Sequence, residues 1–205
     1  MSRVAARTLT SVPAPPHREL MRAAIERDAE AQGALLGGDR DAALAAFGSA
    51  ADLYHASWEA SPPRSYGRLV GMLKSSILAG DATEAAAFAR DALEDEEAVA
   101  GSATASYARA LCALIAGDDP DARRWSEAMA HGGDAFKRTA RALTALALRD
   151  GHAYTAAVGD VVRDFEERES HLTGVKIADT AVMLERLAAA RGMAAGIESP
   201  LMPPI

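Results

Sequence analysis

The sequence is poor in cysteine and in long apolar runs. Cys112 is the single cysteine among 205 residues, so a disulfide within the chain is excluded. No segment reaches the roughly 18 apolar residues that a membrane-spanning helix needs, and the N-terminal residues around Arg3 and Arg7 lack the apolar region of a signal peptide. We therefore expect a cytoplasmic protein in which Cys112 is a small buried hydrophobe.

Motifs for catalysis and nucleotide binding are also missing. The sequence contains no Gly-x-Ser-x-Gly nucleophile motif. Gly37-Gly38 and Gly132-Gly133 lack the Lys-Ser/Thr pair that follows a phosphate-binding loop. The net charge of −7 argues against nucleic acid, because phosphate contacts need clustered Lys and Arg. We expect no cofactor, and a basic protein is the favoured partner.

The residues that are abundant indicate helix. Apolar residues make up 49% of the chain, and about half of these are alanine, while aromatic residues account for only 5%. Alanine is the strongest helix former, and no useful length of sequence alternates with period two. We predict an all-α fold with about nine helices and no strands. Their approximate ranges are 17–36, 39–60, 65–79, 82–93, 98–116, 119–131, 134–149, 152–171 and 176–191.

A turn made of Gly and Asp recurs between these helices. It contains Gly38, Gly80, Gly117 and Gly151, which are 42, 37 and 34 residues apart. We expect each Gly to end one helix, and Asp39 and Asp81 to cap the helix that follows them. Five residues after each Gly comes an alanine, and eight or nine residues after the first three comes an aromatic. These residues are Ala43, Ala85, Ala122 and Ala156, and Phe47, Phe88 and Trp125.

This spacing resembles the tetratricopeptide repeat, most closely in residues 80–93. The resemblance implies antiparallel helical hairpins stacked in a solenoid, and a non-repetitive helical bundle is the alternative. We expect a flexible N-terminal arm (1–16), ending in several prolines, before one helical domain (17–205). The apolar residues of 193–205 predict a cap over the last hairpin, namely Ile197, Leu201, Met202 and Ile205.

The C-terminal third carries a second resemblance. A hairpin turn lies at 145–154, a helix rich in small residues at 181–193, and an apolar Ser-Pro tail at 198–204. Together they resemble the C-terminal half of immunity protein 49, a family of bacterial polymorphic toxin systems. Leu201-Met202 stands where that family has an aromatic residue. The resemblance implies an all-α cytosolic protein that binds and blocks a toxin without catalysis of its own.

Two groups of charged residues are candidates for partner binding. Asp160, Asp164, Glu167 and His171 have helical spacing, which places them on one stripe pointing away from the apolar face. Residues 94–97, Glu94, Asp95, Glu96 and Glu97, form the densest charged run, which we expect to end a helix and line a loop. Each group is either a docking surface for a basic partner or an ordinary solvated surface.

Metal binding is the third interpretation of the stripe, and the spacing argues against it. Glu167 and His171 are four residues apart, as are Glu127 and His131. The di-iron pattern of helical bundles instead requires Glu and His three residues apart, together with further carboxylates. We therefore predict no metal site.

The sequence thus favours a helical-repeat protein that binds another protein, namely a toxin or effector with a basic surface. A helical enzyme or a binder of a small ligand or metal is the alternative, with a pocket between hairpins near Trp58, Tyr107 or Trp125. A scaffold that assembles with itself as a homo-oligomer is the third option.

Overall fold

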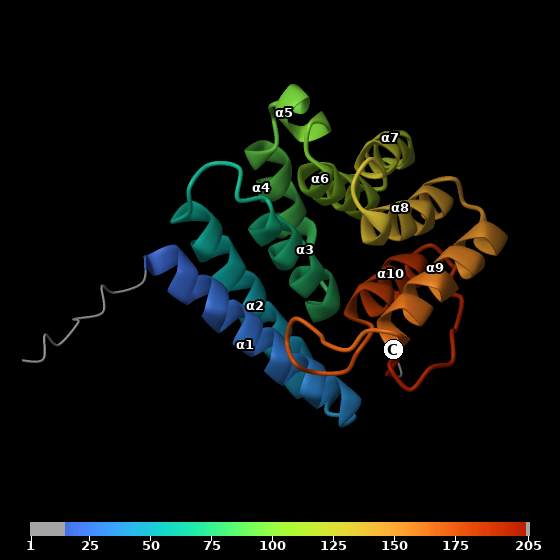
Figure 1. Ribbon diagram of the computed structural model, residues 1–205, viewed down its shortest axis with the longest axis horizontal. Coiled ribbons are helices and arrows are strands. Elements are labelled where there is room, and N and C mark those ends of the chain that lie inside the picture. Colours follow the sequence, from blue (N-terminus) through green and yellow to red (C-terminus); the bar gives the residue numbers. More distant parts are fainter. Residues whose placement is uncertain (1–14, 204–205) are drawn as a thin grey trace, which may run out of the picture.

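A computed structural model describes residues 15–203, and this range contains ten α-helices and no strand (Figure 1). The all-α prediction is confirmed. The helices are α1 (Pro16–Leu36), α2 (Arg40–Glu59), α3 (Gly67–Ala79), α4 (Thr83–Ala92), α5 (Glu96–Ala100), α6 (Ala103–Ala116), α7 (Asp119–Met129), α8 (Asp134–Ala147), α9 (Gly151–Glu166) and α10 (Asp179–Ala189). None of these helices is long and apolar enough to cross a membrane. Residues 1–14 of the expected arm lie outside the described range, and Pro16 already belongs to α1.

The tenth helix arises because the expected helix 98–116 is divided in two. Gly101 follows the last residue of α5, and the Ser102 side chain then accepts the N–H of Ala105 and caps α6. The expectation that residues 94–97 line a loop is half wrong. Glu96 and Glu97 form the first turn of α5, where negative charge is favoured by the helix dipole.

The recurring turn behaves as expected where Gly is followed by a capping Asp. Gly38 and Gly117 have φ angles of 79° and 76°, the left-handed conformation that glycine adopts without steric cost. The carboxylates of Asp39 and Asp118 each accept, at 3.1 Å, the N–H of the residue three positions later. One helix is thereby ended and the next one capped within two residues.

The other two turns depart from this pattern. Asp81 is not the N-cap residue of α4, and its carboxylate accepts the N–H of Thr83 at 2.9 Å in the turn before that helix. In the last turn Arg149, with a φ of 57°, takes the left-handed conformation, and Asp150 caps α9. The prediction that Gly151 ends the preceding helix is therefore wrong, since Gly151 is the first residue of α9.

Consecutive helices pack as hairpins, with α1 against α2, α3 against α4, α6 against α7 and α8 against α9. The repeated aromatic residues lie where these helices meet. Phe47 and Trp125 are each 1% exposed, and Phe88 is half-buried. Small alanines let the helices approach, and the large rings fill the space between them.

The last helix occupies the inside of the curve that the hairpins form. Figure 1 shows α10 within the arc of α3, α6, α8 and α9, and it packs against α3, α8 and α9. Both α9 and α10 are shorter than the ranges predicted for them, because α9 ends at Glu166 and α10 begins only at Asp179. The connecting segment 167–178 runs back toward α1.

The described part of the tail, residues 193–203, packs against α10 and its surroundings. Ile197, Leu201 and Met202 contact the core. The buried carboxylate of Glu185 accepts the N–H groups of two tail residues, at 3.1 and 2.9 Å, and the hydroxyl of Tyr154 at 2.7 Å. Three hydrogen bonds compensate for the burial of this charge. Residues 204 and 205, including Ile205 of the expected cap, lie outside the described range.

Candidate functional site

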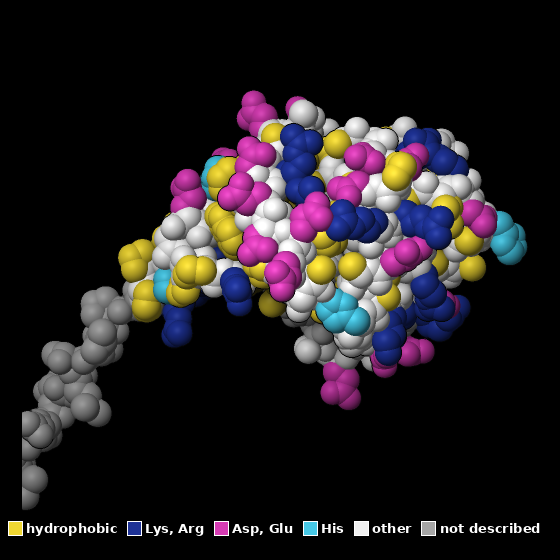
Figure 2. Space-filling view, turned by 90° about the horizontal axis from the view of Figure 1, so that it is seen from above, with side chains coloured by type: hydrophobic (Ala, Val, Ile, Leu, Met, Phe, Trp, Pro, Cys, Tyr) yellow, Lys and Arg dark blue, Asp and Glu magenta, His cyan; other side chains and the backbone are white. Residues whose placement is uncertain are grey.

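Residues 81–97 form what we call the acidic segment, which spans α4 and the start of α5. It contains seven Asp and Glu residues and one Arg, and all seven carboxylates are exposed. Within the described residues only one of the seven has an ion-pair partner, because Glu96 pairs with Arg124 at 2.7 Å. Two more, Asp81 and Asp95, accept backbone N–H groups. Figure 2 looks onto this end of the molecule and shows carboxylates crowded on one part of its surface.

Residues 134–168, from α8 to just past α9, form the balanced segment, which contains six Asp and Glu and six Lys and Arg. Asp160 contacts Arg141 at 2.9 Å and Arg163 at 2.8 Å. Asp164 pairs with Arg138 and Arg168. Each of these carboxylates therefore has two guanidinium partners, and the stripe predicted to attract a basic protein is neutralised along this part of its length.

The stripe is also shorter than predicted. Glu167 follows the last residue of α9, and His171 lies four residues further along, in the connecting segment, where its ring centroid is 6.0 Å from that of Phe165. The helical spacing that placed all four residues on one stripe therefore fails after Asp164. Of the two predicted groups, residues 94–97 have the larger share of carboxylates without a basic partner in the described residues.

No group of three or more His, Cys, Asp or Glu side chains in the described range is arranged to hold a metal ion. Glu127 contacts Arg123 at 2.8 Å, and the Nδ1 atom of His131 contacts a backbone oxygen of its own turn. The thiol of Cys112 is buried, and burial raises its pKa to about 12, which keeps it protonated and unreactive at neutral pH.

Three aromatic residues were candidates for lining a pocket, and they have different surroundings. The ring of Trp125 is buried, with the guanidinium groups of Arg109 and Arg124 at 5.9 and 4.6 Å from its centroid. Trp58 stacks on Tyr66 with centroids 6.0 Å apart. Tyr107 lines a cavity that lies between α3, α6, α8 and α9 and has a volume of about 230 Å³.

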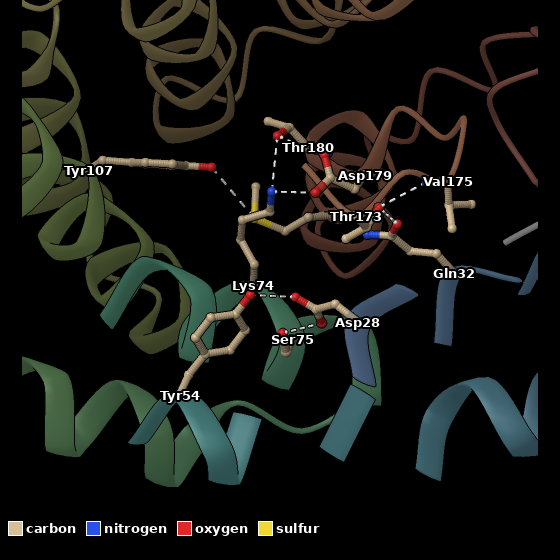
Figure 3. A network of polar contacts seen from close by, with 11 residues as sticks. Asp28, Gln32, Tyr54, Lys74, Ser75, Tyr107, Thr173, Val175, Asp179 and Thr180 are labelled. Atoms are coloured by element: carbon tan, nitrogen blue, oxygen red, sulfur yellow. Dashed lines mark hydrogen bonds and ion pairs between the residues drawn. The ribbon is translucent and has the colours of Figure 1, made fainter. Parts of the chain in front are cut away.

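A network of polar side chains joins the N-terminal hairpin to α3, and was not predicted (Figure 3). Asp28 of α1 accepts hydrogen bonds from the hydroxyls of Tyr54 and Ser75, each at 2.8 Å. Burial raises the pKa of Asp28, although these two donors oppose that shift. In the sequence, Asp28 is one of many charged residues of its helix and Tyr54 belongs to the apolar pattern of the next, so no local pattern indicates that they meet.

A second part of this network ties α10 to the array. Lys74 of α3 donates to Asp179 at 2.8 Å and to Thr180 at 3.2 Å. Burial alone would lower the pKa of Lys74, but the negative charge of Asp179 raises it, so the ammonium group stays charged. Nearby, Thr173 of the connecting segment donates to Gln32 of α1 at 2.5 Å. These contacts hold the connecting segment and α10 against the first hairpins.

Comparison with models of protein families, with characterised proteins and with solved structures finds no match for this chain.

Proposed function

We propose that this chain is a non-catalytic binding protein whose acidic segment docks on the basic surface of another protein. One observation carries the proposal: seven exposed carboxylates lie between residues 81 and 97, and a single one of them has an ion-pair partner in the described residues. Such a surface attracts a positively charged protein and accelerates its association. The stacked hairpins, which we describe as tetratricopeptide-like, hold it on a rigid support.

The position of α10 favours docking on the outer surface of the array. Helical solenoids commonly bind their partners along the concave surface. Here α10 fills the inside of the curve and is held there by Lys74 and by the tail contacts of Glu185. The acidic segment lies away from this interior and is exposed, so a partner can reach it without displacing α10.

The class of partner follows from the second sequence resemblance. Residues 141–204 resemble the immunity protein 49 family, whose members neutralise toxins in bacteria. A toxin that acts on nucleic acid needs clustered Lys and Arg to contact phosphates. An acidic protein that covers this cluster would block the toxin without any chemistry of its own. We therefore propose a cytoplasmic immunity role against a basic toxin.

Co-expression with a toxin encoded beside its gene tests this role. The account expects restored growth of the host, and a one-to-one complex in size-exclusion chromatography with light scattering. Toxicity that persists, with no complex between the purified proteins, would refute the immunity role. The same light-scattering measurement on the chain alone tests the alternative of self-assembly, which predicts a mass that rises with concentration.

A further inference from the structure

The cavity beside Tyr107 is lined by five helices. Its walls come from α3, α6, α8 and α9, and Thr180 at the start of α10 closes one side. Its volume is about 230 Å³. A protein cavity of about 150 Å³ accommodates benzene, so this one has room for a single aromatic ring with a short chain attached.

The body of the cavity is apolar and rich in aromatic side chains. Val70, Tyr107, Phe136, Val161 and Phe165 line it. The rings of Tyr107 and Phe136 meet edge to face, with centroids 6.4 Å apart, a geometry that a third ring can extend. The surface is therefore suited to an aromatic ligand.

The polar part of the cavity has an excess of positive charge. Arg138 and Arg168 both line it, and both bind the single carboxylate of Asp164. Two guanidinium groups thus share one negative charge, in side chains that are 27% and 36% exposed. Arg168 also lies over the ring of Phe165, 3.8 Å from its centroid, which fixes the guanidinium beside the apolar wall. A second carboxylate would balance the charge.

We propose that this cavity binds a small aromatic monocarboxylate, with its ring among Tyr107, Phe136 and Phe165 and its carboxylate between Arg138 and Arg168. Guanidinium groups bind carboxylates through strong, directed hydrogen bonds, which gives the site its preference for an anion. The ligand would contact four helices and the start of α10 at once. The cavity is distinct from the acidic segment, so either proposal can fail without the other.

Calorimetric titration of the full chain with 3-phenylpropionate and with 3-phenylpropan-1-ol tests the proposal. The two compounds have the same ring and chain, and differ in the charge of the head group. We expect saturable binding of the acid at one site, and binding of the alcohol that is about tenfold weaker, because it lacks the charge-assisted hydrogen bonds. Absence of saturable binding of the acid would overturn the proposal, as would equal affinity for the alcohol.

Three variants locate the site. Arg138→Gln and Arg168→Gln should each weaken binding of the acid about tenfold, because each removes one guanidinium partner. Asp164→Asn should strengthen it, because the competing carboxylate is gone, and should leave binding of the alcohol unchanged. A purely structural role for Asp164 would not separate the two ligands in this way.

Arg141→Gln is the matched control. Arg141 lies on the same helix as Arg138 and pairs with Asp160, outside this cavity. Binding to this variant should equal that of the wild type. Equal weakening in Arg141→Gln and Arg138→Gln, or unchanged binding in both cavity variants, would contradict the proposed position of the carboxylate.

Discussion

The acidic and the balanced segments look alike as sequence stretches and differ in their surroundings. Both contain closely spaced carboxylates, and each includes residues of one of the two groups predicted to dock a basic protein: residues 94–97 in the acidic segment, and Asp160, Asp164 and Glu167 in the balanced segment. In the balanced segment, Asp160 and Asp164 each contact two arginines. In the acidic segment, Glu96 is the one carboxylate that pairs with an arginine among the described residues, and that arginine belongs to α7. A carboxylate is available to a partner only where no arginine of the same chain has already bound it.

The comparison shows that the number of carboxylates on a helix is a weak guide to binding. The guanidinium groups that neutralise Asp164 come from α8 and from just beyond α9, so one of them is distant in sequence. The acidic segment has a single arginine of its own, and within the described residues Arg124 is the one arginine that pairs with its carboxylates. The two segments therefore differ in how far the charges of their carboxylates are balanced by neighbouring arginines in the folded protein.

The largest expected effect is on partner affinity. Reversing two charges of the acidic segment, in Glu94→Lys with Glu97→Lys, should weaken binding of the basic toxin about a hundredfold, because like charges placed opposite one another cost several kcal/mol. Both residues are exposed, so folding should be unaffected. Titration calorimetry measures the change.

Glu167→Lys with Glu169→Lys is the matched control for that double variant. Both residues are exposed at the start of the connecting segment that follows α9, and the net charge changes by the same amount. The account expects a much smaller loss of affinity here, caused by long-range charge alone. Equal losses in the two double variants would show that net charge matters and the position of the carboxylates does not.

The second effect is on stability, in the balanced segment. Asp164→Asn should lower the free energy of unfolding by about 1–2 kcal/mol, because Arg138 and Arg168 both lose a partly buried ionic partner. Asp91→Asn in the acidic segment removes an exposed charge that has no basic partner in the described range, and should not destabilise the protein. Urea denaturation measures both variants, and an equal loss in the two would erase the distinction between the segments.

The third effect is on the pH dependence of stability. It concerns Asp28, whose carboxylate accepts hydrogen bonds from hydroxyl groups and belongs to neither segment. Because burial raises the pKa of Asp28 above 3.8, the folded protein holds its proton more tightly than the unfolded chain does. Protonated Asp28 therefore stabilises the folded protein at pH values below its ordinary pKa. This stabilisation is lost as the pH rises through the pKa that Asp28 has in the folded protein. As the pH rises above about 4, the Asp28→Asn variant should therefore lose less stability than the wild type. An identical slope in both proteins would contradict the raised pKa.

The smallest effect is expected at the ion pair that Glu96 of the acidic segment makes with Arg124. Glu96→Gln removes the contact with Arg124, and both side chains are about half exposed. Exposed pairs contribute little to stability, so thermal unfolding should not change measurably. A clear drop in the melting temperature would show that α5 depends on this pair for its attachment to α7.

Local chemistry explains which parts of the fold could be predicted. Alanine content and the turn residues Gly38, Asp39 and Gly117 predicted helices and their ends, because these preferences act within a few residues. The failures are local as well. Arg149 takes a conformation that favours glycine, and Ser102 caps a helix inside an otherwise continuous apolar pattern.

The candidate sites were harder to predict, because they depend on contacts between distant residues. Lys74 meets Asp179 across more than a hundred residues of sequence, and Asp28 meets Tyr54 on another helix. Tyr107 was one of three aromatic residues named in the alternative of a pocket between hairpins, and it lines a cavity, but its helical spacing gave no sign of the arginines beside it. The charges of the balanced segment were visible in the sequence, whereas their pairing was not.

Hydrogen–deuterium exchange on the complex with the toxin tests the central claim most directly. Amide exchange is measured for the chain alone and for the complex, over peptides that cover residues 81–101 and 150–168. The account predicts that toxin binding slows exchange in residues 81–101 and leaves residues 150–168 unchanged. Protection confined to residues 150–168 would contradict this prediction. It would indicate that the toxin docks on the stripe that contains Asp160 and Asp164.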